Sequence, residues 1–131
     1  MRVMLDSNIL FSALLFSEET MNKLMQKVTT EHKLVLSSYV VNELLDVTRR
    51  KFPNKLVVID TLLSQLPYEL VYTPEQTEPG LFKIRDMNDY PVLYSAISED
   101  VDVFITGDKD FDEVDIEKPE IMTPAEFIAK Y

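Results

Sequence analysis

The sequence predicts an α/β protein with three α/β/α layers, in which helices cover both faces of a mainly parallel sheet of four to five strands. Short apolar segments alternate with helical patterns along the chain, which is typical of strands joined by crossover helices. The candidate strands are apolar along most of their length, as expected of strands buried on both faces. The 131 residues have the length of one domain, 1–131, and contain no repeat or linker.

The first third of the chain predicts two strands and the helix between them. Residues 2–5 form a short apolar segment that fits a buried first strand. Apolar residues at helical spacing between 21 and 28 predict a helix that Ser17 could cap. Residues 33–36 then predict the second strand.

Two helices and a third strand follow. Apolar residues at helical spacing predict a helix over 40–52, which Pro53 ends. A second helix, over 54–66, ends at Pro67, and residues 69–72 predict the third strand.

The last third begins with a loop, 73–80, that is rich in Pro, Glu and Thr. A helix begins near Pro91, because the fixed backbone angle of proline suits a first helical turn. Residues 102–106 are the clearest strand, 120–122 predict a short edge strand, and 124–130 predict the terminal helix.

The composition excludes several kinds of active site. The chain has no cysteine, so disulfides, thiolate zinc sites and cysteine nucleophiles are excluded. His32 is the only histidine, which excludes multi-histidine metal sites and paired-imidazole ribonuclease chemistry. Two glycines are too few for a phosphate-binding loop or a dinucleotide fingerprint.

The chain is strongly acidic, with a net charge of -10. Such a surface repels nucleic acid and anionic membranes, so a phosphate-bearing substrate would need local basic residues or bridging cations. The longest apolar stretch, 9–16, is far shorter than the ~20 residues of a membrane span. We therefore expect a cytoplasmic protein without a membrane partner.

Acidic residues follow the predicted strands where a parallel α/β sheet places its active site. That site lies beyond the carboxyl ends of the strands. Asp6 follows the first strand and Asp108 the fourth, while Asp86 and Asp89 lie three residues apart before the Pro91 helix. Glu43 lies in the helix after the second strand, about 40° outside its apolar arc on an ideal helical wheel.

Carboxylates gathered at one edge repel each other, and a divalent cation can neutralise them. Mg²⁺ and Mn²⁺ favour carboxylate oxygens and retain waters for substrate phosphate. The acids therefore predict phosphodiester hydrolysis, which needs no cysteine, histidine cluster or glycine loop.

Each acid also has a structural interpretation. A single Asp after a strand is most often a turn former or helix cap, and Asp89 could cap the helix that follows it. Glu43 taken alone is typical of a solvated helix residue. We interpret a further group of acids as surface charge: Asp100, Asp102, Asp110, Asp112 and Asp115.

Four motifs surround the candidate site acids in chain order. They are Asp6-Ser7-Asn8-Ile9-Leu10, Val41-Asn42-Glu43-Leu44-Leu45, Arg85-Asp86-Met87-Asn88-Asp89 and Ile105-Thr106-Gly107-Asp108-Lys109-Asp110-Phe111. Together with the end of the chain, they resemble the PIN domain family over residues 1–127. The C-terminal segment, 121–127, is similar to one prokaryotic branch, the toxin components of toxin-antitoxin pairs.

The resemblance implies a metal-dependent nuclease that cuts single-stranded RNA and uses Mg²⁺ or Mn²⁺. The residues that match the acidic quartet of the family are Asp6, Glu43, Asp89 and Asp108. Asp86 is a second candidate for the third position, and Asn8 and Thr106 match the polar residues that orient the acids. The third motif departs from the commoner pattern by carrying Asn88 and Tyr90 beside Asp89, so the register stays open.

The resemblance also implies a cognate antitoxin that occludes the site, and family habit suggests a homodimer. RNA binding would need a basic strip, and the candidates are Arg49, Arg50, Lys51 and Lys55. These residues are equally typical of favourable charge near a helix C-terminus. Two other readings are a PIN-like binding or regulatory module without turnover, and a receiver-type phospho-acceptor domain. A receiver-type domain would have a pair of acidic residues after the first strand, whereas only Asp6 follows the first strand here.

Overall fold

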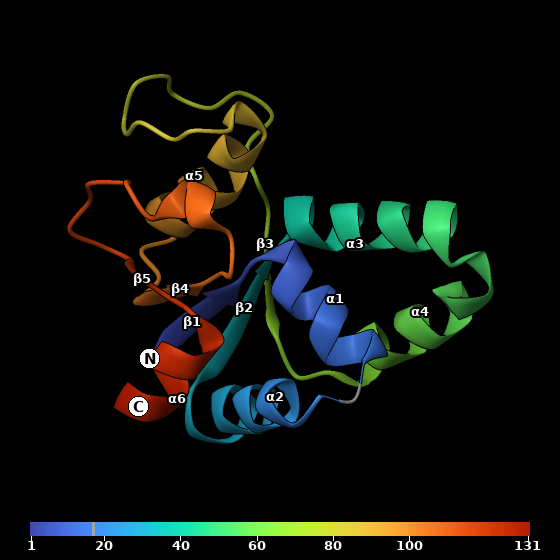
Figure 1. Cartoon of the computed structure of the whole chain (residues 1–131). Helices are drawn as coiled ribbons and strands as arrows, with labels where there is room; N and C mark the ends of the chain where they lie inside the picture. Colours follow the sequence, from blue (N-terminus) through green and yellow to red (C-terminus); the bar gives the residue numbers. More distant parts are fainter. Residues whose placement is uncertain (17) are drawn as a thin grey trace.

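A parallel five-stranded sheet forms the centre of the computed structural model, which describes residues 1–16 and 18–131 (Figure 1). The strand order is β3-β2-β1-β4-β5, and every neighbouring pair is parallel. The strands are β1 (Arg2–Leu5), β2 (Lys33–Ser37), β3 (Glu69–Val71), β4 (Val103–Ile105) and β5 (Glu120–Met122). All five lie where the sequence predicts strands, so the predicted sheet is confirmed.

Helices cover both faces of this sheet and complete three layers. In Figure 1, α5 lies on one side of the sheet, and α2 and α6, which pack against each other, lie on the other. The helices are α1 (Ser7–Leu15), α2 (Glu19–Glu31), α3 (Ser38–Lys51), α4 (Leu56–Gln65), α5 (Tyr90–Ser98) and α6 (Pro124–Lys130). Short 3₁₀ turns form η1 (Pro53–Lys55), η2 (Met87–Asp89) and η3 (Lys109–Phe111). The predicted α/β/α architecture is therefore confirmed.

The hydrophobic core lies between the sheet and these helices. Apolar residues of the three interior strands β2, β1 and β4 are buried, as expected of strands covered on both faces. Leu24 and Val28 of α2 are also completely buried, and they belong to the helical spacing seen in the sequence. No helix among the described residues is long and apolar enough to cross a membrane.

Three details differ from the prediction. Helix α1 was not predicted, because residues 9–16 are apolar without a clear helical period. The helix expected over 54–66 begins at Leu56, because the residues before it form the 3₁₀ turn η1. The cap expected from Ser17 lies outside the described residues, and Glu18 occupies the N-cap position of α2 without a side-chain hydrogen bond.

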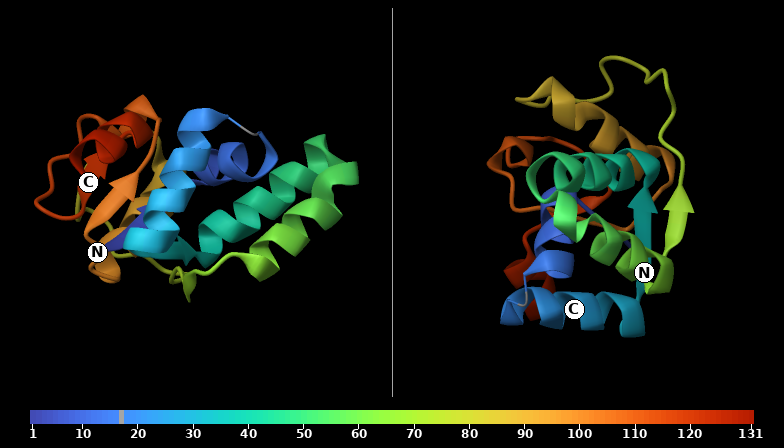
Figure 2. Two further views of the ribbon diagram at one scale, coloured as in Figure 1. Left: turned by 90° about the horizontal axis from the view of Figure 1, so that it is seen from below. Right: turned by 90° about the vertical axis from the view of Figure 1, so that its right-hand side faces the viewer.

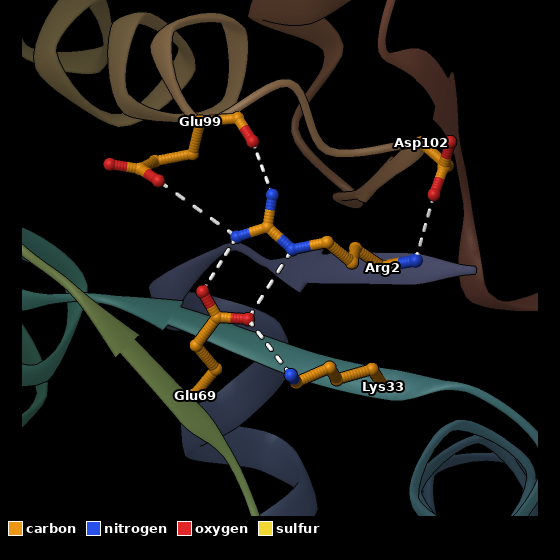
Figure 3. Close-up of polar contacts among 5 residues, drawn as sticks. All are labelled: Arg2, Lys33, Glu69, Glu99 and Asp102. Atoms are coloured by element: carbon orange, nitrogen blue, oxygen red, sulfur yellow. Dashed lines mark hydrogen bonds and ion pairs between the residues drawn. The ribbon is translucent and has the colours of Figure 1, made fainter.

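An ion-pair network ties the strands together at their amino ends (Figure 3). The Arg2 guanidinium donates two hydrogen bonds to the Glu69 carboxylate, at 2.7 and 3.3 Å, and one to the backbone carbonyl of Glu99. Lys33 lies 3.5 Å from the same Glu69 carboxylate, and the backbone N–H of Arg2 donates to Asp102 at 2.8 Å. This network joins β1, β2, β3 and the start of β4 at their amino ends. It does not involve the carboxyl ends of the strands, where Asp6 and Asp108 lie.

Candidate metal centre

The strand order places the ends of β1 and β4 side by side. From β1 the chain builds outward to β2 and β3 on one side, whereas β4 and β5 lie on the other. This reversal is the position where open α/β sheets bind ligands. Asp6 directly follows β1, Asp108 follows β4 by three residues, and the Asp6 N–H donates to the Ile105 carbonyl at 3.0 Å.

Asp6 is held rigidly by two neighbours. Its Oδ1 accepts a hydrogen bond from the backbone N–H of Ser7 at 2.7 Å and caps helix α1. Its Oδ2 accepts one from the Thr106 hydroxyl at 2.8 Å. Burial raises the pKa of Asp6, and the charges of Glu43 and Asp108 raise it further against the effect of these hydrogen bonds. The carboxylate is therefore fixed in position but costly to ionise.

Thr106 links this carboxylate to Asp108. Its hydroxyl oxygen donates to Asp6 and accepts the backbone N–H of Asp108 at 3.0 Å. Asp108 in turn accepts the backbone N–H of Asp110 at 2.9 Å and caps η3. The structure thus places Thr106 where it can orient two acids, the role that the resemblance implied for it.

Glu43 joins the cluster from helix α3. The Ser7 hydroxyl donates to its Oε1 at 2.6 Å, which connects α3 to the start of α1. The sequence reasoning missed Ser7 and expected Asn8 to orient the acids. Asn8 is exposed, and its side chain makes no hydrogen bond with the described residues. The observed contact to Glu43 comes from its neighbour because Ser7, not Asn8, is buried against the cluster.

Among the described residues, Asp89 is the acid with a buried carboxylate oxygen that no donor contacts. It occupies the N-cap position of α5 but makes no side-chain capping hydrogen bond, so the interpretation of Asp89 as a helix cap is wrong. Its Oδ2 is buried and has no hydrogen-bond partner among the described residues. Burial, followed by the charges of Asp108, Asp6, Asp86 and Asp110, raises the pKa of Asp89 to about 7.

Asp86 and Asp110 lie beside Asp89. Asp86 accepts the backbone N–H of Asn88 at 3.0 Å and closes the turn η2. One carboxylate oxygen from each of Asp86, Asp89 and Asp110 lies within 4.8 Å of the others. The interpretation of Asp110 as surface charge is therefore wrong, because η3 turns this half-buried side chain toward the other acids. Arg85 lies 3.6 Å from Asp110 and supplies one nearby positive charge.

The chemistry of these side chains fits a divalent cation. The acids of the cluster offer carboxylate oxygens, which are the hard ligands that Mg²⁺ and Mn²⁺ prefer. The buried Asp89 oxygen finds no donor within residues 1–16 and 18–131, and such an oxygen is costly unless a cation or water contacts it. Asp86, Asp89 and Asp110 have the spacing of a metal-binding group. Asp6 and Asp108 are close enough to Asp89 for their charges to raise its pKa.

The C-terminal end of α3, which projects away from the sheet (Figure 2), carries the four basic candidates together with η1. Arg49, Arg50 and Lys51 form the last turn of α3, Lys55 follows in η1, and all four are exposed. Arg49 pairs with Asp46 at 3.1 Å. Lys51 shares a pocket with Ser7 and Glu43 and so faces the acidic cluster. Their position at a helix C-terminus fits a basic strip that binds RNA, and it fits equally a favourable interaction of positive charge with the helix end.

The fold and the site define a parallel α/β protein with a cluster of carboxylates at the carboxyl edge of its sheet. A PIN domain family model matches residues 2–110, and the chain belongs to this family. The match ends before the C-terminal segment, so the resemblance of 121–127 to the toxin branch stays a prediction. No curated protein matches the sequence.

A solved structure has a similar fold. It is the crystal structure of VapBC2 from Rickettsia felis bound to a DNA fragment from their promoter, and the alignment has a TM-score of 0.71. The matched parts cover 93% of this chain and 97% of that one, with 20% sequence identity. The likeness shows that the fold extends over nearly the whole of both chains.

Proposed function

We propose that this protein is a Mg²⁺- or Mn²⁺-dependent endoribonuclease that hydrolyses phosphodiester bonds of single-stranded RNA. Membership of the PIN domain family supports a nuclease. The observation that carries the metal dependence is the buried oxygen of Asp89, which has no hydrogen-bond partner in the described part of the chain although other carboxylates surround it. A fold gains nothing from this arrangement without a cation, because like charges destabilise it.

In this proposal, Asp6, Asp89 and Asp108 hold the ion, with Asp86 and Asp110 beside them. When bound, such an ion supplies positive charge for the phosphate and lowers the pKa of a coordinated water. Glu43 completes the set of acids or orients the attacking water from its place on α3. Thr106 and Ser7 keep the carboxylates in position through hydrogen bonds, because supporting contacts of this kind tune metal affinity.

We further propose that residues 1–131 form a single nuclease domain, and that the protein is the toxin of a toxin-antitoxin pair and acts in the cytoplasm. The fold likeness to a chain of VapBC2 supports an antitoxin partner. A cognate antitoxin would inhibit cleavage by covering the acidic cluster. Homodimerisation is part of the same proposal, and sedimentation of the purified chain tests it.

The decisive experiment is cleavage of end-labelled single-stranded RNA by the purified protein. We expect cleavage with Mg²⁺ or Mn²⁺, none with a chelator, and a loss of at least 100-fold in Asp6→Asn and Asp108→Asn. Asp115→Asn is the matched control, because this exposed acid lies outside the cluster. Cleavage by Asp6→Asn at the wild-type rate would disprove the assignment. RNA binding without turnover would instead favour the regulatory module.

A further inference from the structure

A pocket of about 230 Å³ opens between the start of α1 and the second half of α3. Glu43 and Ser7 line it, so the pocket includes one acid of the cluster with the serine that donates to it, and it adjoins the cluster. Phe11, Lys51, Phe52 and Asn8 supply further lining. Its volume lies below the roughly 300 Å³ at which sites for drug-sized ligands begin. A single flat group fits such a space better than a larger ligand.

Two aromatic rings give the pocket an apolar wall. The ring centroids of Phe11 and Phe52 lie 5.8 Å apart, and the planes are inclined at 41°. Phe11 is half-buried and fixed in the packing of α1, whereas 39% of the Phe52 surface is exposed. An exposed aromatic ring beside a phosphodiester site is the usual platform for an unpaired base, because every base has a face that can stack.

Positive charge accompanies these rings in a protein that is otherwise strongly acidic. Lys51 lines the pocket and makes no ion pair with the described residues, whereas Arg49 is paired with Asp46. Arg50 and Lys55 are exposed at the same end of α3. Proteins that bind single strands combine basic residues for the backbone with aromatic side chains for the bases.

We propose that this pocket binds one unpaired base of the RNA substrate, next to the phosphodiester bond that is cleaved. Phe52 stacks on the base and Lys51 contacts an adjoining phosphate. The exposed amide of Asn8 offers a donor and an acceptor to the base edge, so Asn8 determines base preference. The inference rests on the proposed ribonuclease activity and adds a specificity subsite to it.

An abasic scan of the substrate tests the pocket without changing the protein. Single-stranded RNAs that lack one base at successive positions around the cleaved bond are compared with the intact RNA by kcat/KM. Stacking of one base corresponds to roughly 5- to 150-fold in affinity. We therefore expect a loss of that size at one position adjoining the cleaved bond, and smaller effects at the others.

Phe52→Leu removes the aromatic face but keeps an apolar side chain. This variant should lower kcat/KM on intact RNA at least 5-fold, and a missing base at the sensitive position should then cause no further loss. Phe52→Trp should keep the wild-type kcat/KM on intact RNA and its loss at the abasic position. Phe16→Leu is the matched control, because Phe16 also contacts Phe11 but does not line the pocket. Unchanged melting temperatures show that the variants are folded.

Two further variants test charge and base reading. Lys51→Ala should weaken RNA binding and reduce the slope of log affinity against log salt by about 0.7, the effect of one phosphate contact on a single strand. Lys23→Ala, on the exposed surface of α2, should not change the slope. Asn8→Ala should reduce the difference in kcat/KM among the four bases at the sensitive position.

Fluorescence anisotropy of labelled RNA with the Asp108→Asn variant separates the pocket from catalysis. If wild-type protein cleaves RNA but the abasic scan is flat and Phe52→Leu behaves like Phe16→Leu, the base pocket is disproved and the nuclease stands. Such a result would assign the pocket to an apolar side chain of a protein partner. If the protein neither binds nor cleaves RNA, both proposals fail.

Discussion

Asp89 should make the metal-free protein less stable as the pH rises. Its pKa is about 7 in the folded protein and 3.8 as an ordinary carboxyl group. The folded state therefore holds a proton that the unfolded state has lost, so the free energy of unfolding falls as pH rises from about 4 to 7. The contribution of Asp89 to the free energy of unfolding is therefore fully present below pH 3.8, the pKa of the unfolded state. It is lost as the pH rises through about 7, the pKa of the folded state.

The size of the effect follows from the two pKa values. A difference of this size would be worth about 4 kcal/mol for a fully buried carboxyl group. Asp89 is only half-buried, and water screens its charge, so we expect about 1–2 kcal/mol. Asp89→Asn removes the charge without changing the shape of the side chain. It should raise the free energy of unfolding by that amount at pH 8 and by roughly a third of it at pH 5, where the unfolded carboxyl group is already mostly ionised.

Urea unfolding at both pH values, with chelator and then with Mn²⁺, measures this difference. Asp115→Asn is the control, since this exposed acid lies outside the cluster and its variant should match wild type throughout. With metal the order should reverse, because an ion at 100 times its Kd stabilises the wild-type protein by about 2.7 kcal/mol. An Asp89→Asn variant that is less stable than wild type at pH 8 without metal would refute the reasoning.

Three other predictions concern contacts around the sheet. Thr106→Val should weaken Mn²⁺ binding 10- to 100-fold by calorimetry, because the Asp6 carboxylate loses its donor; unchanged affinity would exclude this positioning role. Arg2→Met should lower the free energy of unfolding by about 1 kcal/mol in urea and leave Mn²⁺ affinity unchanged, since Arg2 lies at the opposite edge. Thr123→Ala removes one half of the capping box that Thr123 and Glu126 form at the start of α6, and it should cost about 1 kcal/mol. A melting temperature equal to wild type would contradict this estimate.

The strands could be predicted because each is a short apolar segment between helices. The structure places β1 over Arg2–Leu5 and β5 over Glu120–Met122, as the sequence predicts. Helix α1 could not be recognised from periodicity, since its inward face is apolar and Phe11, Leu14 and Leu15 on other sides are also apolar. Those side chains pack against the rest of the core, so no polar face marks the helix.

The cluster was predictable only as far as the sheet topology determines it. Parallel strands bring their carboxyl ends to one edge, which predicts that Asp6 and Asp108 are neighbours. The positions of Asp89 and Asp110 depend on two 3₁₀ turns, η2 and η3, which sequence periodicity does not reveal. One signal for Asp110 was available in the sequence, namely its position two residues after Asp108. An Asp side chain commonly accepts a hydrogen bond from the backbone N–H two residues later, and Asp108 accepts the Asp110 N–H in this way.

The net charge of -10 is distributed unevenly, and this bears on how the proposed ribonuclease would bind a polyanion. At the amino edge, acids are paired: Arg2 and Lys33 neutralise Glu69, and Lys118 lies 3.1 Å from Asp100 and 3.4 Å from Asp102. At the carboxyl edge, Arg85 is the basic residue that pairs with the cluster among the described residues. Whole-protein charge therefore says little about the substrate. A divalent cation would correct the local deficit of positive charge at the carboxyl edge. The basic end of α3 would then remain free to contact the backbone of the proposed RNA substrate.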